Sequence, residues 1–265
     1  MVYESDSNML KMVDRACKIL DYLKEQDQPA SISVLSKDLD LPKANVFRIL
    51  YTLQHNGLIE KTLETDLYKL GSKFIQYGEK VKQDFSLVDA CKPHMSKLAK
   101  QIGESVNLGI VYDKHILTIH SEEGERSSLV SKLVPVAEPY CSSMGKLYLS
   151  QLPDDVLKNY YTSQLETRTV NTITNYNVFK KQQTDILENN IAFDHEEYEY
   201  GLSCIAVPLH KTTGELVAMI SISGPTTRLQ FKGFDDIADK LKHLAYTIEK
   251  DSSTLLNIIE SIHNK

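Results

Sequence analysis

One stretch near the N-terminus, residues 41–60 with the sequence LPKANVFRILYTLQHNGLIE, restricts the fold of this chain more than any other. Pro42 suits the first turn of a helix, where a missing N–H costs nothing, and Gly57 suits the left-handed position that ends one. The apolar residues recur at the spacing of one helical face: Val46, Ile49, Leu50 and Leu53. No acid occurs before Glu60, although the chain has a formal net charge of -6. The stretch therefore predicts an amphipathic helix whose outer face is free of acids.

The segments around this helix complete a known pattern. Residues 10–25 repeat apolar side chains at spacings of three and four, so a helix is predicted there. Ser33 is expected to cap a second, short helix, which the sequence DLDLP ends. Two short runs, 58–62 and 67–70, flank the turn-prone sequence ETD and predict a hairpin. Helix, short helix, helix and hairpin is the order of a winged helix-turn-helix, whose third helix enters a DNA major groove.

The outer face of the third helix is suited to DNA, because carboxylates there would repel phosphates. Arg48 is the strongest candidate for a contact, since a guanidinium can pair with guanine or clamp a phosphate. Phe47 fits either the core or a contact to a thymine methyl group, and the contact is the preferred interpretation. An ordinary surface helix with few acids is the alternative. The polar positions expected at the surface are Lys43, Asn45, Arg48, Thr52, Gln54 and His55.

Length and composition are typical of a soluble protein with two domains. The chain has 265 residues, of which 42% are hydrophobic and 25% are charged. The net negative charge excludes a protein that coats nucleic acid without regard to sequence, but it permits a local basic face. The N-terminus lacks the apolar core of a signal peptide, and no apolar run approaches the roughly 18 residues of a membrane span. We therefore expect a cytoplasmic protein without membrane contact.

Beyond the hairpin the sequence predicts a connecting helix at 72–81 and a further helix at 87–101. The pattern then changes to β-rich runs: VNLGIVYD, HILTIHSE, LSCIAVPLH and LVAMISISG. Further helices are expected near 143–151, 153–161 and 178–189, and from residue 234 to the C-terminus. The predicted fold class is α+β, with a winged helix-turn-helix followed by a mixed antiparallel sheet and flanking helices.

The cysteines and the acids near residue 194 could in principle carry other chemistry. The four cysteines form no C-x-x-C pair, so neither a zinc ribbon nor a redox motif is predicted. The run FDHEEYEYG gathers acids around Asp194, but alternation along a strand sends neighbours to opposite faces and disfavours a metal site. Cys141 and Cys204 would need His120 or His210 within reach to act as nucleophiles, and no spacing indicates this. We expect no cofactor, metal or catalytic residue; a thiol-dependent enzyme for a small acid and a protein–protein adaptor stay open.

Several segments together resemble the IclR family of bacterial transcriptional regulators over nearly the whole chain. They occur in the order typical of the family: RACKIL, LSKDLDLPKANVFRILYTLQHNGLIEK, YKLGSKFIQYG, ESVNLGIVYD, SSMGKLYLSQLP, FDHEEYEYGLSCIAVPL and LVAMISISGPTTRL. The resemblance implies a winged helix-turn-helix at 1–71, a linker helix at 72–83 that supports dimerisation, and a GAF-like domain at 84–265. It also implies a small-molecule effector, often an organic acid, and assembly as a homodimer or a dimer of dimers.

The resemblance and the residue chemistry together give two sets of candidate site residues. The DNA-binding set is Lys43, Ala44, Asn45, Phe47, Arg48, Thr52, Lys61 and Lys69. The effector-binding set, carried over from the family, is Ser142, Ser143, Met144, Gly145, Asp194, Cys204, Ser221 and Ser223. A helix N-terminus offers free N–H groups to a carboxylate, and serines two apart on a strand point to one face. The expected partners are therefore a double-stranded DNA operator and a small carboxylate.

The chain departs from the family pattern in two places. The tip of its hairpin reads ETDLYK where the family has a basic tip, so contacts of this wing to the minor groove rest on Lys61 and Lys69 alone. The turn PYCSSMGKLY has Tyr140 in place of a common histidine, and Met144 and Leu147 in place of small residues. We expect Met144 to narrow the effector pocket, which leaves the identity of the effector open, together with the choice between repression and activation.

Overall fold

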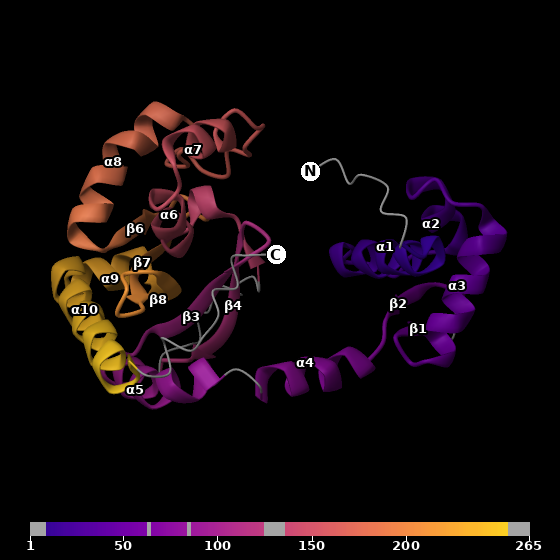
Figure 1. Ribbon diagram of the computed structural model, residues 1–265, viewed down its shortest axis with the longest axis horizontal. Helices are drawn as coiled ribbons and strands as arrows, with labels where there is room; N and C mark the ends of the chain where they lie inside the picture. Colours follow the sequence, from indigo (N-terminus) through magenta and orange to yellow (C-terminus); the bar gives the residue numbers. More distant parts are fainter. Residues whose placement is uncertain (1–8, 63–64, 84–85, 125–135, 254–265) are drawn as a thin grey trace. The chain divides into compact units, whose positions relative to one another are not determined.

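The computed structural model describes residues 9–62, 65–83, 86–124 and 136–253. The chain divides into two compact units, residues 1–84 and 85–265. Figure 1 labels the helices and strands of both units. In the described residues no helix is both long enough and apolar enough to cross a membrane.

The first unit is a winged helix-turn-helix, as predicted. Its elements are α1 (Lys11–Glu25), α2 (Ile32–Asp38), α3 (Lys43–His55), β1 (Ile59–Lys61), β2 (Tyr68–Leu70) and α4 (Lys73–Gln83). Strands β1 and β2 pair antiparallel, and Ala30 forms a bridge to Tyr68 of β2. The apolar faces of the helices meet in one core, where Ile19, Leu35 and Leu50 are fully buried. This core fixes α3 by its inner face and leaves the outer face free.

The ends of α2 and α3 follow from local chemistry, with one correction. The cap of α2 is Ser31, whose Oγ accepts from the N–H of Val34 at 3.3 Å, and not Ser33, which lies inside the helix. The bridge of Ala30 to the wing keeps the chain extended up to Ser31, so the helix cannot begin earlier, and the hydroxyl of Ser31 caps it there. Pro42 precedes α3 and Gly57 follows it with φ +73°, as expected for a left-handed residue after a helix.

The second unit is a six-stranded sheet with helices on both faces. Its elements are α5 (Ser86–Ile102), β3 (Ser105–Tyr112), β4 (His115–Glu122), β5 (Val136–Ala137), η2 (Pro139–Cys141), α6 (Ser143–Ser150), α7 (Asp154–Tyr160), α8 (Tyr176–Asn189), β6 (Ala192–His195), β7 (Leu202–His210), β8 (Leu216–Pro225), α9 (Thr226–Lys232) and α10 (Phe234–Asp251). The strand order is β5-β4-β3-β8-β7-β6. The α+β class is confirmed.

The expectation of an antiparallel sheet is confirmed, because every pairing among the described strands is antiparallel. A parallel pair needs a crossover of a dozen or more residues, whereas β3 to β4 and β7 to β8 are joined by tight turns. The expected helix from residue 234 to the C-terminus is described as far as Asp251, and the residues from 254 onward lie outside the described part of the chain.

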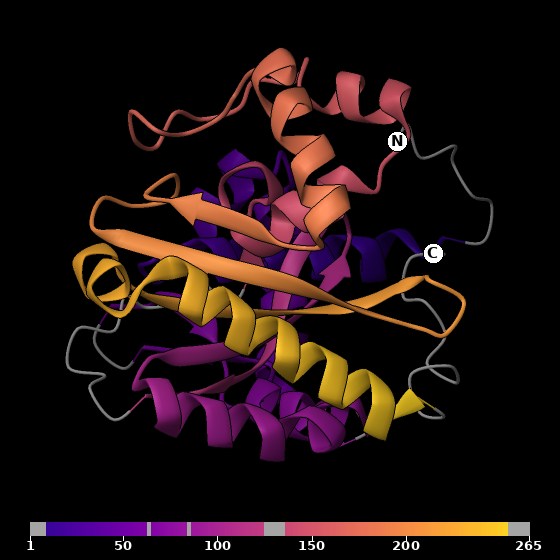
Figure 2. The same ribbon diagram turned by 90° about the vertical axis from the view of Figure 1, so that its left-hand side faces the viewer.

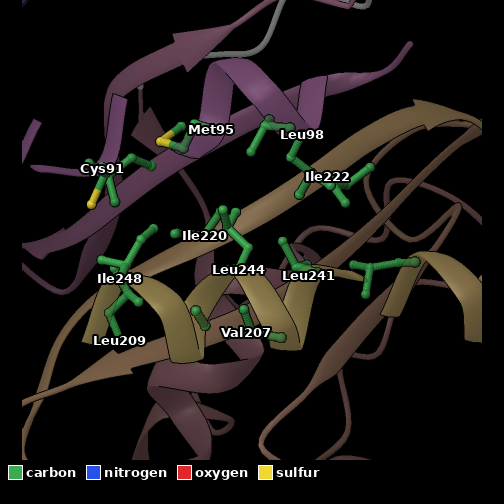
Figure 3. Packing of buried hydrophobic residues seen from close by; sticks show 14 of the residues in the cluster. Cys91, Met95, Leu98, Val207, Leu209, Ile220, Ile222, Leu241, Leu244 and Ile248 are labelled. Carbon is green, nitrogen blue, oxygen red and sulfur yellow. The ribbon is translucent and has the colours of Figure 1, made fainter. Parts of the chain in front are cut away.

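Helices α5 and α10 cover one face of the sheet. Figure 2 shows α10 lying across the strands with α5 beside it. Their apolar side chains meet those of β7 and β8 in a core that includes Met95, Val207, Ile220, Leu241 and Ile248 (Figure 3). The other face carries η2, α6, α7 and α8, which form a second core with Met144, Phe179 and Met219 among its members. The two cores hold the sheet rigid from both sides.

A buried ionic cluster fixes α9 against the start of β3. Glu104 is only 1% exposed, and Arg228 donates to both of its carboxylate oxygens at 2.6 Å. Lys232 completes the cluster, pairing with Glu104 and donating to the carbonyl of Ile102 at 2.6 Å. A buried carboxylate needs such partners, because an unpaired charge in the interior is costly.

Candidate functional site

The outer face of α3 presents most of the predicted DNA-binding residues to solvent. Lys43, Ala44, Phe47, Arg48 and Thr52 are exposed, whereas Asn45 is half-buried. Neither the Lys43 ammonium nor the Arg48 guanidinium has an ion pair or side-chain hydrogen bond within the described residues, so both are available to a phosphate or a base. The hydroxyl of Thr52 donates to the carbonyl of Arg48 at 2.9 Å and has to rotate before it can donate to DNA.

Two aromatic side chains project from the same helix. Phe47 is 54% exposed, so the core alternative for this residue is excluded. Tyr51 is 66% exposed and was missed by the sequence reasoning. Its position could have revealed it, because it lies one turn after Phe47 on the side opposite the buried residues Val46 and Leu53.

The wing lysines are engaged with acids of the wing itself. Lys61 pairs with Asp66 at 2.6 Å, and Lys69 pairs with Glu60 at 3.6 Å. These pairs are exposed and therefore weak, but they offset the charge that the two lysines would offer to phosphates. The wing is thus a poorer anion-binding element than its lysine content suggests. Residues 63 and 64 at its tip lie outside the described residues.

In the second unit, strand register brings several predicted effector-binding residues into one polar row. Asp194 on β6 pairs with Cys204 on β7, which pairs with Ser223 on β8. Ser221 lies two residues before Ser223 and therefore on the same face. This is the face of Ala192 and Met219, which is covered by α6. Asp194 is 1% exposed and both serines are nearly as buried.

Asn107 joins this row and was not predicted. It is fully buried on β3, opposite Ser221, and its Nδ2 donates to the hydroxyl oxygens of Ser221 at 3.4 Å and Ser223 at 3.2 Å. Its Oδ1 accepts from Ser121 at 2.7 Å. Because both serines accept from the amide, their own O–H groups can donate elsewhere: Ser223 has Cys204 within hydrogen-bond reach, and either hydroxyl could turn to a ligand oxygen. No local sequence signal shows this role of Asn107, since Ser221 and Ser223 lie more than a hundred residues away from it in the sequence.

The start of α6 faces the same region. Ser142 is its N-cap: the hydroxyl accepts from Gly145 N–H at 3.2 Å and donates to Glu138 O at 2.9 Å. Gly145 packs so tightly that a Cβ there would lie 2.2 Å from Cα of Pro139, while Ser143 and Met144 are buried. The Met144 thioether points at β3, where a Cβ on Gly109 would lie 2.7 Å from its sulfur.

A buried ion pair lies beside this helix start. Lys146, 2% exposed, pairs with Glu197 at 2.5 Å, and the N–H of Glu197 donates to Oδ1 of Asp194 at 2.7 Å. The second carboxylate oxygen of Glu197 and the hydroxyls of Tyr160 and Tyr161 are buried without a hydrogen-bond partner among the described residues. Buried polar atoms of this kind usually have a partner, so these three are candidates to bind a ligand or water. Sequence reasoning missed all four side chains.

Burial raises the pKa values of both an acid and the thiols in this region. Burial raises the pKa of Asp194 to about 7, despite the opposing hydrogen bond from Glu197 N–H and the charge of Lys146. Burial likewise raises the pKa of Cys141 to about 12 and that of Cys204 well above its usual value. A thiol of high pKa is a poor nucleophile, because only the thiolate attacks. This weakens the thiol-enzyme alternative.

The histidines considered as bases are occupied elsewhere. His120 lies 2.7 Å from Glu122, and His210 lies 3.5 Å from Glu249. His195 follows Asp194 on β6 but points to the other face, where its ring stacks on Phe193. In the described part of the chain, no group of three or more His, Cys, Asp or Glu residues is arranged to hold a metal ion.

A surface groove of about 510 Å³ lies apart from the polar row. It follows the outer edge of β6 between α8 and α10, and Lys146, Ile186, His195, Asp239 and Lys242 contribute to its lining. None of the eight predicted effector-binding residues lines it. The predicted ligand site is thus a buried polar cluster under α6, and the groove is a separate feature.

A winged helix-turn-helix with an acid-free outer helix, followed by a helix-covered antiparallel sheet, defines a helix-turn-helix regulator of transcription. The chain belongs to the IclR family: residues 12–63 match the IclR helix-turn-helix domain, and residues 79–250 match the family described as bacterial transcriptional regulator IclR C-terminal. It is a transcriptional regulator and not an enzyme, since the relatives it matches are regulators.

Individual relatives agree with this assignment. The chain is 29% identical to the DNA-binding transcriptional repressor YiaJ of Escherichia coli over 245 residues, which cover 89% of this chain and 86% of YiaJ. It is 28% identical to the repressor AllR of Salmonella typhimurium over 250 residues, 93% of this chain and 90% of AllR. The crystal structure of IclR from Thermotoga maritima superimposes with a TM-score of 0.68 at 29% identity, covering 92% of this chain and all of that one.

Proposed function

We propose that this regulator is a repressor that binds an operator through α3 and releases or retains it in response to a small carboxylate bound under α6. The observation that carries the DNA part is the outer face of α3, which is free of acids and holds Lys43 and Arg48 without ion pairs to any described residue. The names of YiaJ and AllR support repression. The protein then works in the cytoplasm, where its operator lies.

On the DNA, Arg48 contacts a guanine in the major groove and Lys43 a phosphate. Thr52, on the flank of the face, lies nearer the backbone, and Lys61 and Lys69 add weak wing contacts. Two copies, joined with the help of the linker helix at 72–83, read half-sites of a roughly palindromic operator about one helical turn apart. A chain of net charge -6 cannot rely on bulk electrostatic attraction to bind DNA. The base contacts of α3, made once by each of the two copies, supply the specificity.

In the second unit, the carboxylate of the effector accepts hydrogen bonds from the serine hydroxyls that Asn107 orients, and from free N–H groups at the start of α6. Glu197 and Tyr161 have buried polar atoms without partners, so the effector carries hydroxyl or N–H groups in addition to its carboxylate. Effector binding shifts the DNA-binding equilibrium only if the effector binds more tightly to one arrangement of the two DNA-binding heads, the winged helix-turn-helix units of the two copies.

The test combines DNA and effector measurements on the full-length protein. Fluorescence anisotropy at two salt concentrations compares the DNA upstream of the protein's own gene with a scrambled duplex, for the wild type, Arg48→Ala and Lys158→Ala. Lys158 is an exposed lysine of α7 and controls for a lost charge. We expect Arg48→Ala to weaken specific binding by about 1–3 kcal/mol and Lys158→Ala to leave it unchanged.

A screen of small hydroxylated acids against the protein–DNA complex then tests the effector part. Asn107→Ala is expected to abolish the response and to leave DNA affinity without effector intact. Equal weakness of all variants on both duplexes would favour the adaptor alternative. A response that survives Asn107→Ala would place the effector elsewhere.

A further inference from the structure

The outer face of α3 has an apolar centre. With about 100° between successive residues of an α-helix, Ala44 and Tyr51 lie on the line directly opposite the core residue Leu53. Phe47 and Arg48 lie on either side of that line, and Lys43 lies toward one flank. Phe47 is 54% exposed and Tyr51 is 66% exposed, so their rings project into solvent in the free protein.

Such a pair of exposed rings is unusual at the centre of a functional face. Large apolar side chains in water are stabilised by any partner that covers them, and a cluster on one surface indicates a binding site. The inner face of α3 is already packed against the core through Val46, Ile49 and Leu50, and neither ring belongs to that core. Their partner must therefore be whatever docks on the outer face.

In a DNA major groove, only one base offers an apolar group at its edge. Thymine carries a C5-methyl, which alanine and aromatic side chains contact, whereas the other bases present hydrogen-bond donors and acceptors. We propose that Ala44, Phe47 and Tyr51 form an apolar reading face that binds thymine methyl groups. The operator half-site then has A·T pairs next to the G·C pair that Arg48 contacts, a conclusion that rests on the proposed docking of α3.

The spacing along the helix agrees with neighbouring base pairs. Phe47 and Tyr51 are four residues apart, or about 6 Å along the helix axis. One base-pair step is about 3.4 Å, so the two rings reach bases separated by no more than two steps. Arg48 lies between them along the axis. Tyr51 is exposed and its hydroxyl has no hydrogen-bond partner in the described part of the chain, so it can donate to a base or phosphate oxygen at the rim of the contact.

The test begins with selection of binding sequences from a pool of random duplexes by the full-length protein, which requires no knowledge of the natural operator. The selected duplex is then prepared with deoxyuridine in place of thymidine, which removes the methyl groups and leaves all hydrogen-bonding atoms in place. For the wild type we expect an affinity loss of about fourfold for each contacted methyl, the value for one buried CH₂ group. The ratio of the two affinities is the measured quantity.

Variants show which ring is responsible for the ratio of thymine-duplex to uracil-duplex affinity. Phe47→Ala and Tyr51→Ala should each bind the thymine duplex more weakly and lose part of the thymine-to-uracil ratio, whereas Tyr51→Phe should keep the ratio because the ring remains. Lys43→Ala is the matched control on the same helix. It should weaken binding to both duplexes equally, because a phosphate contact does not sense the methyl group.

The outcomes separate this inference from the proposed function. If selection yields no preferred sequence, the docking of α3 itself is wrong. If a preferred sequence is found but uracil duplexes bind equally well, or both alanine variants keep the full ratio, the apolar reading face is wrong while sequence-specific binding stands. Selected half-sites without a fixed A·T pair beside a G·C pair would also overturn it.

Discussion

In the proposed complex with DNA, Asp66 competes with the phosphates for the side chain of Lys61. The two lie 2.6 Å apart on the wing, and Asp66 also places a negative charge where phosphates would approach. Its φ of +53° is left-handed, a conformation that asparagine tolerates well. Asparagine at this position therefore keeps the backbone and removes the charge.

We predict that Asp66→Asn binds operator DNA several-fold more tightly than the wild type. The freed lysine releases one more counterion, so the slope of log affinity against log salt should steepen by about 0.9. Anisotropy titrations over a salt series measure both effects. Asp113→Asn is the matched control, since Asp113 has a φ of +46° and lies in the second unit. Unchanged affinity and slope for Asp66→Asn would show that the wing does not approach DNA.

Asp194 makes the stability of the chain depend on pH in an unusual direction. Burial raises its pKa to about 7, whereas an unfolded aspartate titrates near 3.9. Between these values the folded chain holds a proton that the unfolded chain releases, so stability is greatest at the acidic end and falls as the pH rises toward 7. Above that window the contribution is constant.

We therefore expect the wild type to lose stability between about pH 5 and about pH 8 and Asp194→Asn to lose less. The asparagine oxygen can still accept from the N–H of Glu197, so the variant tests the charge and not the hydrogen bond. Urea midpoints of the full-length proteins at the two pH values measure the difference. Parallel pH profiles for the two proteins would show that Asp194 titrates normally.

Local patterns revealed some residues of the two sites and not others. Arg48 could be placed on the outer face from its charge and its position in the helix, Phe47 stayed open between the core and that face, and Tyr51 was accessible to the same argument. Asn107 and Glu197 could not be found, because their roles come from Ser221 and Lys146, which lie far away in the sequence. Strand register and burial create those partnerships, and neither can be read from one chain segment.

At the level of elements, the ion pair of Lys146 and Glu197 ties α6 to the segment after β6. Both side chains are almost completely buried. Removing one partner of such a pair leaves a buried charge alone, whereas removing both leaves none. The pair therefore tests how firmly the start of α6, with Ser142 to Gly145, is held.

We predict that Lys146→Met lowers the free energy of unfolding by about 3–5 kcal/mol and that the double variant Lys146→Met, Glu197→Gln recovers most of the loss. Urea unfolding of the three proteins checks this. A double variant as unstable as the single one would mean that packing around the methylene groups, and not the charge, holds the pair.

Elements with strong periodicity were predicted, and so were short ones with a cap or turn signal, whereas β6 and α9 were not. The helices α1, α3, α5 and α10 and the strands β3, β4, β7 and β8 have long runs of the appropriate period, and the structure contains all of them. Strand β6 has four residues within an acidic run, and α9 begins with two threonines that also suit a strand. The order of the strands, β5-β4-β3-β8-β7-β6, depends on how distant strands meet, which periodicity does not encode.

At the level of the whole molecule, the residues just before α1 and in its first turn suggest how two copies meet. Met9, Leu10, Met12 and Val13 are all large, apolar and at least 42% exposed. An apolar surface of this kind near a DNA-binding head fits the proposed pairing of two heads on one operator.

We predict that Leu10→Asp combined with Val13→Asp reduces self-association and weakens operator binding, because two linked heads bind far more tightly than one. Sedimentation velocity gives the assembly state, and Gln26→Asp, just beyond the end of α1, controls for added charge. An unchanged sedimentation coefficient would place the dimer contact elsewhere in the chain.

The ion pairs within the wing also bear on how many copies of the regulator a cell needs. Random genomic DNA retains proteins through their unpaired cations. The chain has a net charge of -6 and its wing lysines are paired with its own acids, so we expect it to bind such DNA weakly. Few molecules are then sequestered along the chromosome, and most remain free to search. We expect a small pool of this protein to keep its operator occupied, with occupancy set by the affinity of that one sequence.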